Sequence, residues 1–310
     1  MSPEQAPEVL LPEAQDLEVL RILVALDATE DSLASLDLAT RLAAKLRADL
    51  EGLFVEDINL LRMAGLPCTR VVSVTTTSGQ GLDLPSMERE LRRQARVARD
   101  TLAMNAERFA VRWSFRTARG SMAGEILAAA ADADIVIIGK SDRAYPQKQK
   151  LGSTARTLSA KSPSAVLIAH HRFIAAEYSP PGAILVAYDD TATSDRALRL
   201  AARIAVSERH PITVLIPESK RAAPRLQDAA EALLAAFGLQ PRIRFVSRRD
   251  SVRLAKIVHA EHGELFVLGC ESPLLRGKST DSVVESLEIP VLLIRPSVPE
   301  TNAYQAESSG

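Results

Sequence analysis

The chain carries an internal duplication, which constrains its fold more than any other feature of the sequence. The segment Ile22-Leu-Val-Ala-Leu-Asp27 returns 162 residues later as Ile184-Leu-Val-Ala-Tyr-Asp189. Identical residues keep this offset in the stretch that follows: Thr29 and Thr191, Ser32 and Ser194, Leu36 and Leu198, Ala39 and Ala201, Arg41 and Arg203, and Ala43 and Ala205. A repeat of this length indicates two copies of one folding unit.

Each copy alternates short apolar runs with segments whose apolar residues recur every three or four positions. The runs predict buried strands, and the periodic segments predict amphipathic helices. Strands that alternate with helices form a parallel sheet with helices on both faces. We therefore predict an α/β fold of two tandem, doubly wound parallel-sheet domains.

The domain boundaries follow from composition. We expect a disordered leader at 1–18, a first domain at 19–174, a linker at 175–182, a second domain at 183–297 and a disordered tail at 298–310. The linker contains Ser179-Pro-Pro-Gly182, and Pro and Gly interrupt regular structure.

Residues 57–86 of the first domain have no counterpart in the second and fit no regular element well. Within them, Thr75 to Gly81 has the composition of a mobile loop. An irregular segment of this length inside a compact domain is usually functional or disordered. We interpret it as an insertion through which a protein partner could dock.

Composition and charge exclude several classes of protein. The net charge of −1 gives no overall attraction to nucleic acid or to an anionic membrane. No run approaches the roughly 18 apolar residues that span a bilayer, and the acidic N-terminus lacks the pattern of a signal peptide. Two cysteines are too few for a disulfide framework, so we expect a cytoplasmic protein.

A long helix is predicted from Met87 to Leu102, and one face of it is rich in arginine. We interpret this face as solvated and partly paired with neighbouring acidic residues. Weak contact with nucleic acid stays open, although specific binding is not expected because no aromatic platform accompanies the arginines.

An anion site is predicted where the apolar run Ile135–Gly139 meets a cationic loop. The cationic residues are Lys140, Arg143, Lys148 and Lys150. The segment Gly152-Ser153-Thr154 then opens a helix, whose first backbone N–H groups have no partner within the helix. This arrangement suits a phosphate, and we expect only one or two of the four cations to reach it.

Each half begins with a strand followed by Asp and ends with a glycine, a loop and a second glycine, which Ser follows directly in the first half. In these features the chain resembles the universal stress protein family in its tandem-domain form. The resemblance implies a Rossmann-like fold of the adenine nucleotide alpha hydrolase-like type. ATP-binding members carry glycine, two residues, glycine, nine residues, and then glycine with Ser or Thr. Here Gly139 fills the first place, Asp142 stands in the second, and Gly152 and Ser153 fill the last two.

The resemblance also implies a role for individual residues. Asp27 would face the adenosine end of the nucleotide, and Val55 would meet the adenine through its backbone. Gly152, Ser153 and Thr154 would bind phosphate. Three of these assignments have a simpler alternative, because Asp27, Ser153 and Thr154 are residue types that also cap helices.

Asp142 departs from the family pattern. Glycine at that place would allow a positive φ and close approach of the backbone, whereas Asp places a negative charge beside the phosphates. We expect a weakened site made from the residues considered so far, which are Asp27, Val55, Gly139, Lys140, Asp142, Gly152, Ser153 and Thr154.

The second half departs further from the pattern. It reads Gly269-Cys-Glu-Ser272, without a second glycine, and 22 positions separate Gly269 from the next strand against 27 in the first half. We predict that this half binds nucleotide poorly or not at all and forms an intramolecular pseudo-dimer with the first. A homodimer of whole chains stays open.

Our leading hypothesis is an adenine-nucleotide-binding protein of the stress response, with ATP and Mg²⁺ as its ligands. We single out no catalytic residue and no metal ligand, so we expect regulation rather than catalysis. Two alternatives are a protein-interaction module of the same fold that works without nucleotide, and a weak ATPase.

Overall fold

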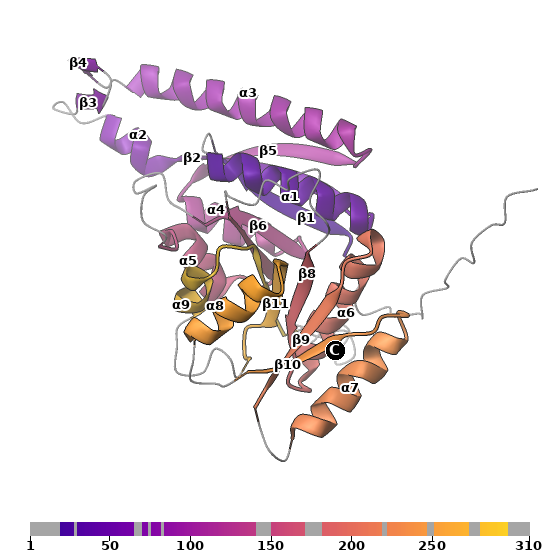
Figure 1. Cartoon of the computed structure of the whole chain (residues 1–310). Helices are drawn as coiled ribbons and strands as arrows, with labels where there is room; N and C mark the ends of the chain where they lie inside the picture. The colour runs from indigo at the N-terminus through magenta and orange to yellow at the C-terminus, as the bar shows by residue number, and fades with distance from the viewer. Residues whose placement is uncertain are drawn as a thin grey trace, which may run out of the picture.

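The computed structural model describes residues 19–27, 30–64, 70–73, 76–81, 84–140, 150–170, 182–218, 222–246, 251–272 and 280–296 (Figure 1). The predicted leader and tail lie outside these ranges, and so does the predicted linker apart from Gly182. The domain boundaries that depend on these segments stay predictions.

The first half contains the elements β1 Arg21–Leu26, α1 Glu30–Leu46, β2 Asp49–Asp57, α2 Ile58–Ala64, β3 Arg70–Ser73, β4 Thr76–Gly81, α3 Leu84–Arg108, β5 Trp113–Gly120, α4 Met122–Ala130, β6 Ile135–Gly139, α5 Ser153–Lys161 and β7 Ala165–Ala169. The second half contains β8 Ala183–Ala187, α6 Ala192–Glu208, β9 Ile212–Pro217, α7 Ala223–Ala235, β10 Arg242–Val246, α8 Ser251–Ala260, β11 Gly263–Gly269, α9 Thr280–Ser286 and β12 Val291–Ile294.

The main strands of both halves join into one sheet. Within the described ranges its order is β10-β9-β8-β11-β12-β7-β6-β1-β2-β5. Taken from β5 to β7, and again from β10 to β12, each half has the doubly wound order 3-2-1-4-5. The predicted α/β class and the repeated architecture are confirmed.

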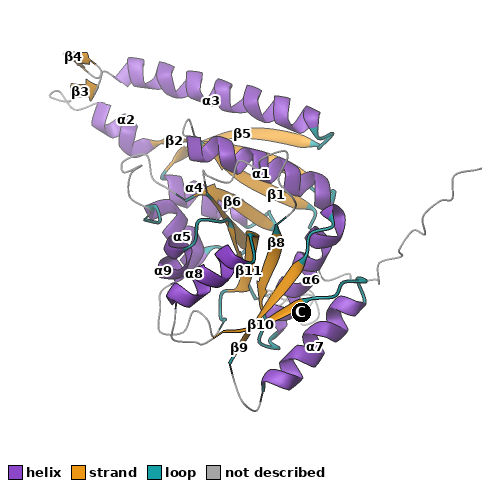
Figure 2. Cartoon of the chain, in the orientation of Figure 1, coloured by secondary structure: helices purple, strands orange, loops and turns teal. Residues whose placement is uncertain are grey.

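Two layers of helices cover the sheet (Figure 2). Side chains of α1, α3, α6 and α7 pack on one face, and those of α4, α5, α8 and α9 pack on the other. Each of the two apolar clusters contains residues from both halves. Central strands such as β6 and β8 are buried on both sides, which explains why they read as continuous apolar runs, whereas the edge strands β5 and β10 are partly exposed.

The halves meet where β7 pairs with β12. This pair is antiparallel, unlike the other strand pairs of the large sheet. Leu167 lies opposite Leu292, and the pairs on either side are Val166 with Leu293 and Ile168 with Val291. A two-fold rotation about the central pair exchanges the two outer pairs. The exchanged residues are alike, because Val166-Leu-Ile is similar in sequence to Val291-Leu-Leu. The seam therefore has the self-complementary form of a symmetric dimer interface.

The prediction that residues 57–86 fit no regular element is wrong, because this insertion contains helices and strands. Helix α2, the antiparallel pair β3–β4 and the start of α3 lie there. Figure 1 shows the hairpin beside the N-terminal end of α3, at one extremity of the molecule. The pattern was missed because Thr76–Gly81 reads Thr-Thr-Ser-Gly-Gln-Gly, without apolar alternation. A partner bound at this insertion stays a prediction.

Helix α3 begins three residues before the predicted Met87 and ends beyond Leu102. Its arginine face carries ion pairs with acidic residues, including Arg92 with Glu88 and Arg93 with Glu90. These contacts match the interpretation of a solvated face whose charges are partly paired. Within the described ranges, no helix is both long and apolar enough to cross a membrane.

Candidate functional site

The predicted site residues come from the carboxyl ends of neighbouring strands. In the first half, β1 lies between β2 and β6, and all three run parallel. The connection after β1 leads to α1 on one face of the sheet, whereas the connection after β6 leads to α5 on the other. The edge between β1 and β6 is therefore the topological switch point, where open α/β sheets bind ligands.

Asp27 follows the last residue of β1 and is half-buried. Its backbone N–H donates to Ser32 Oγ at 2.8 Å, which ties the turn to the first part of α1. The same contact exists in the second half, where Asp189 N donates to Ser194 Oγ at 3.3 Å. The repeat therefore preserves the turn that holds each Asp at the switch point.

Val55 lies one residue beyond the point where β2 stops pairing with β1. The ladder between β1 and β2 ends at Leu26 and Phe54, whereas β2 continues beside β5 as far as Asp57. Val55 as a whole is buried. The role that the resemblance implies for its main chain stays a prediction.

The residues predicted to bind phosphate lie at the start of α5, beside the end of β6. Gly152 N donates to Lys140 O at 2.9 Å, and Lys140 directly follows Gly139. Gly152 is the N-cap of α5 and offers no side chain to its first amides. Ser153 is exposed and Thr154 is half-buried. The helix N-terminus thus lies next to the switch point.

Two predicted residues need separate comment. Asp142, with the cationic residues Arg143 and Lys148, lies outside the described residues. Lys140 is buried, and its Nζ donates to the backbone oxygens of Leu287 at 2.8 Å and Glu285 at 3.2 Å. The ammonium group therefore binds the C-terminal end of α9 in the second half, and its role as a phosphate ligand stays a prediction.

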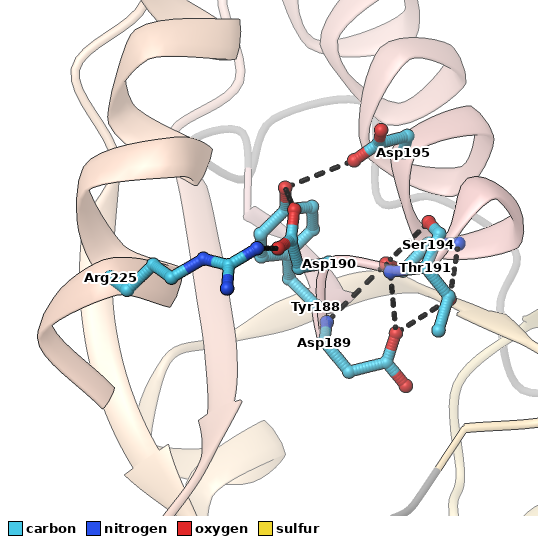
Figure 3. Close-up of polar contacts among 7 residues, drawn as sticks. All are labelled: Tyr188, Asp189, Asp190, Thr191, Ser194, Asp195 and Arg225. Carbon is cyan, nitrogen blue, oxygen red and sulfur yellow. Dashed lines mark hydrogen bonds and ion pairs between the residues drawn. The ribbon is translucent and has the colours of Figure 1, made fainter. Parts of the chain in front are cut away.

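At the corresponding edge of the second half, residues that follow β8 bond to one another (Figure 3). Thr191 Oγ1 donates to the Asp189 carboxylate at 2.6 Å, and Thr191 N donates to the same oxygen at 3.3 Å. The side chain of Thr193 packs against Gly269 at the end of β11, since a Cβ on this glycine would lie 2.9 Å from Thr193 Cγ2. Asp189 is thus engaged within its own turn.

Tyr188 replaces Leu26 of the first half and adds a polar cluster that no sequence pattern predicted. Its hydroxyl donates to Asp195 at 2.9 Å and lies 3.4 Å from Asp190, whose other oxygen pairs with Arg225 at 2.7 Å (Figure 3). Burial, followed by these two carboxylates, raises the pKa of Tyr188 well above its usual value. The tyrosine therefore stays protonated and fixes the loop after β8.

The geometry defines a doubly wound α/β protein, present as two copies in one chain, with the N-terminus of α5 beside the switch point of the first copy. The model of the universal stress protein family matches residues 18–170. The first half of the chain therefore belongs to this family, which confirms the resemblance. No curated protein matches the chain by sequence.

Solved structures share the architecture over nearly the whole chain. A universal stress protein from Archaeoglobus fulgidus DSM 4304 has a TM-score of 0.67 at 18% identity, covering 89% of this chain and 98% of its own. A putative universal stress protein from Pseudomonas aeruginosa UCBPP-PA14 has a TM-score of 0.58 at 17% identity, covering 91% and 95%. At such identity the likeness establishes the fold alone.

Proposed function

We propose that the first half binds an adenine nucleotide, ATP together with Mg²⁺, and that the chain acts as a nucleotide-dependent regulator of the stress response. The observation that carries the proposal is the hydrogen bond from Gly152 N to Lys140 O. This bond sets the N-terminus of α5 beside the end of β6, at the switch point that also holds Asp27. Family membership of this half supports the same ligand class.

Each group at this edge has a chemical task in the proposal. The Asp27 carboxylate would accept hydrogen bonds from sugar hydroxyls or an amino group. Main-chain groups of Val55 would bind the adenine, and the first amides of α5 would bind the phosphates, favoured by the helix dipole. Mg²⁺ would be held mainly by phosphate oxygens and water, as this ion usually is.

In this proposal the second half serves as the pseudo-dimer partner of the first. The self-complementary register between β7 and β12 supports this role. One oxygen of the Asp189 carboxylate accepts two hydrogen bonds from Thr191, and the side chain of Thr193 packs against Gly269. We propose that this edge does not bind nucleotide, so that only the first half does.

Calorimetric titration of ATP–Mg²⁺ tests the proposal with a pair of matched variants. Asp27→Ala removes the carboxylate of the proposed site, and Asp189→Ala makes the same change in the other copy. We expect micromolar affinity in the wild type, a loss of about tenfold or more in Asp27→Ala, and no change in Asp189→Ala.

Three results would count against the proposal. A flat titration of the wild type at millimolar ATP would favour an interaction module that works without nucleotide. Equal losses in both variants would place the ligand elsewhere. Formation of ADP faster than about one turnover per minute would favour the ATPase, although typical enzymes are faster still.

A further inference from the structure

The two ends of the phosphate loop in the first half are bound by a helix of the second half. Residue 140 begins this loop, and Leu151 and Gly152 end it. Besides the two bonds from Lys140 Nζ to the C-terminal end of α9, Leu151 N donates to Glu285 Oε1 at 3.0 Å. Glu285 thus contacts one end of the loop with its side chain and the other with its backbone oxygen.

The Glu285 carboxylate also reaches the first turn of α5. Arg156 Nη2 lies 3.6 Å from Glu285 Oε1, and Arg156 Nε pairs with Asp281 Oδ2 at 3.0 Å. Arg156 Nη2 donates in turn to Leu151 O at 3.4 Å. Glu285 Oε1 therefore contacts both the N–H of Leu151 and the guanidinium group of Arg156. Arg156 in turn binds the carbonyl of Leu151.

The two ends of the loop are buried at these contacts, whereas the Arg156 side chain is 53% exposed. Lys140 and Leu151 are each 3% exposed, and the Glu285 side chain is 29% exposed. Hydrogen bonds to a carboxylate in such surroundings are stronger than those between neutral groups. Glu285 thus holds the N–H of Leu151, and Arg156 holds its carbonyl. Leu151 directly precedes Gly152, so its orientation influences where the first amides of α5 point.

We propose that Glu285 is a positioning residue for the phosphate site of the first half, acting through Leu151 and Arg156 across the seam. The proposal rests on the function proposed above and adds that the second half is required to shape the site. By thermodynamic linkage, a nucleotide bound in the first half stabilises α9 in the second.

The test uses the full-length chain with three variants. Glu285→Ala removes the acceptor, Glu285→Gln keeps an oxygen acceptor for Leu151 N, and Glu231→Ala makes the alanine change on α7, away from the seam. We expect ATP–Mg²⁺ affinity to fall about tenfold in Glu285→Ala, to fall less than about threefold in Glu285→Gln and to stay unchanged in Glu231→Ala.

Amide hydrogen exchange supplies a readout that a general loss of stability would not reproduce. Without nucleotide, peptides covering 150–156 should exchange faster in Glu285→Ala, whereas β1 and α1 should keep their rates. In the wild type, ATP–Mg²⁺ should slow exchange in α9, and Glu285→Ala should abolish this protection.

The possible failures can be told apart. If the wild type does not bind ATP–Mg²⁺, the proposed function fails and the positioning role fails with it. If the wild type binds and Glu285→Ala binds equally well, the positioning role is overturned while the proposed function stands. A loss of affinity accompanied by faster exchange throughout the first half is a folding defect and also overturns the positioning role.

Discussion

At the scale of single residues, the difference between Leu26 and Tyr188 shows how the two copies have diverged. Both residues precede the conserved position of the repeat, Asp27 or Asp189. Leucine adds only apolar contact, whereas the tyrosine hydroxyl brings two carboxylates and Arg225 into one cluster. The tyrosine was visible in the sequence, but its partners were not, because Asp195 and Arg225 become neighbours only in the folded chain.

The raised pKa of Tyr188 predicts how stability changes at alkaline pH. The folded state holds the phenol proton more tightly than the unfolded state, whose tyrosine titrates near pH 10. This contribution is therefore fully present below about pH 10 and is lost as the pH rises above it. Between about pH 9 and pH 11, the free energy of unfolding should fall more steeply in the wild type than in Tyr188→Phe. Urea denaturation at several pH values measures both slopes, and parallel slopes would contradict the prediction.

The ammonium group of Lys140 leads to a second prediction at this scale. Replacing Lys140 by Met keeps most of the volume but leaves the backbone oxygens of Glu285 and Leu287 without this donor. We expect the free energy of unfolding to fall by about 1–3 kcal/mol. Lys161→Met, at an exposed position in the last turn of α5, is the control and should change it little. Chemical denaturation checks both, and an unchanged Lys140→Met would mean that water replaces the ammonium group.

At the scale of elements, the strands and helices of the sheet could be predicted because their apolar residues follow the period of each structure. The strand predicted at Ile135–Gly139 and the helix predicted to open at Gly152-Ser153-Thr154 are both present. The β3–β4 hairpin could not be predicted because Thr76–Gly81 lacks an apolar alternation.

Contacts between elements were harder to foresee than the elements themselves. The bond between Lys140 and Leu287 joins residues that are 147 positions apart, so neither local spacing nor composition signals it. Arg295 makes a comparable contact in the opposite direction, since its guanidinium group donates to the backbone oxygens of Leu158 and Ser159 at the end of α5. Each half thus supplies a cation to a helix C-terminus of the other, where the helix dipole favours positive charge.

At the scale of the whole molecule, the continuous sheet and the shared apolar clusters imply that the halves fold as one cooperative unit. Trp113 on β5 is the only tryptophan, so its fluorescence reports on the first half alone. Circular dichroism in the far ultraviolet reports on both halves. In urea, the two signals of the wild type should change together, as a two-state transition requires.

A substitution at the seam should break this cooperativity. Leu292 is fully buried opposite Leu167, and Leu292→Asp would bury a charge without a partner there. We expect the fluorescence and dichroism midpoints to separate in this variant. Midpoints that already differ in the wild type would show that the halves unfold independently despite their common sheet.

We propose that an adenine nucleotide binds at the switch point of the first half and not at that of the second. Photolabelling with 2-azido-ATP and Mg²⁺, followed by peptide mapping, distinguishes the two switch points. We expect a label on peptides that contain Asp27 or Val55, and excess ATP should prevent it. Labelling of peptides around Asp189, or labelling that excess ATP does not prevent, would contradict the proposal.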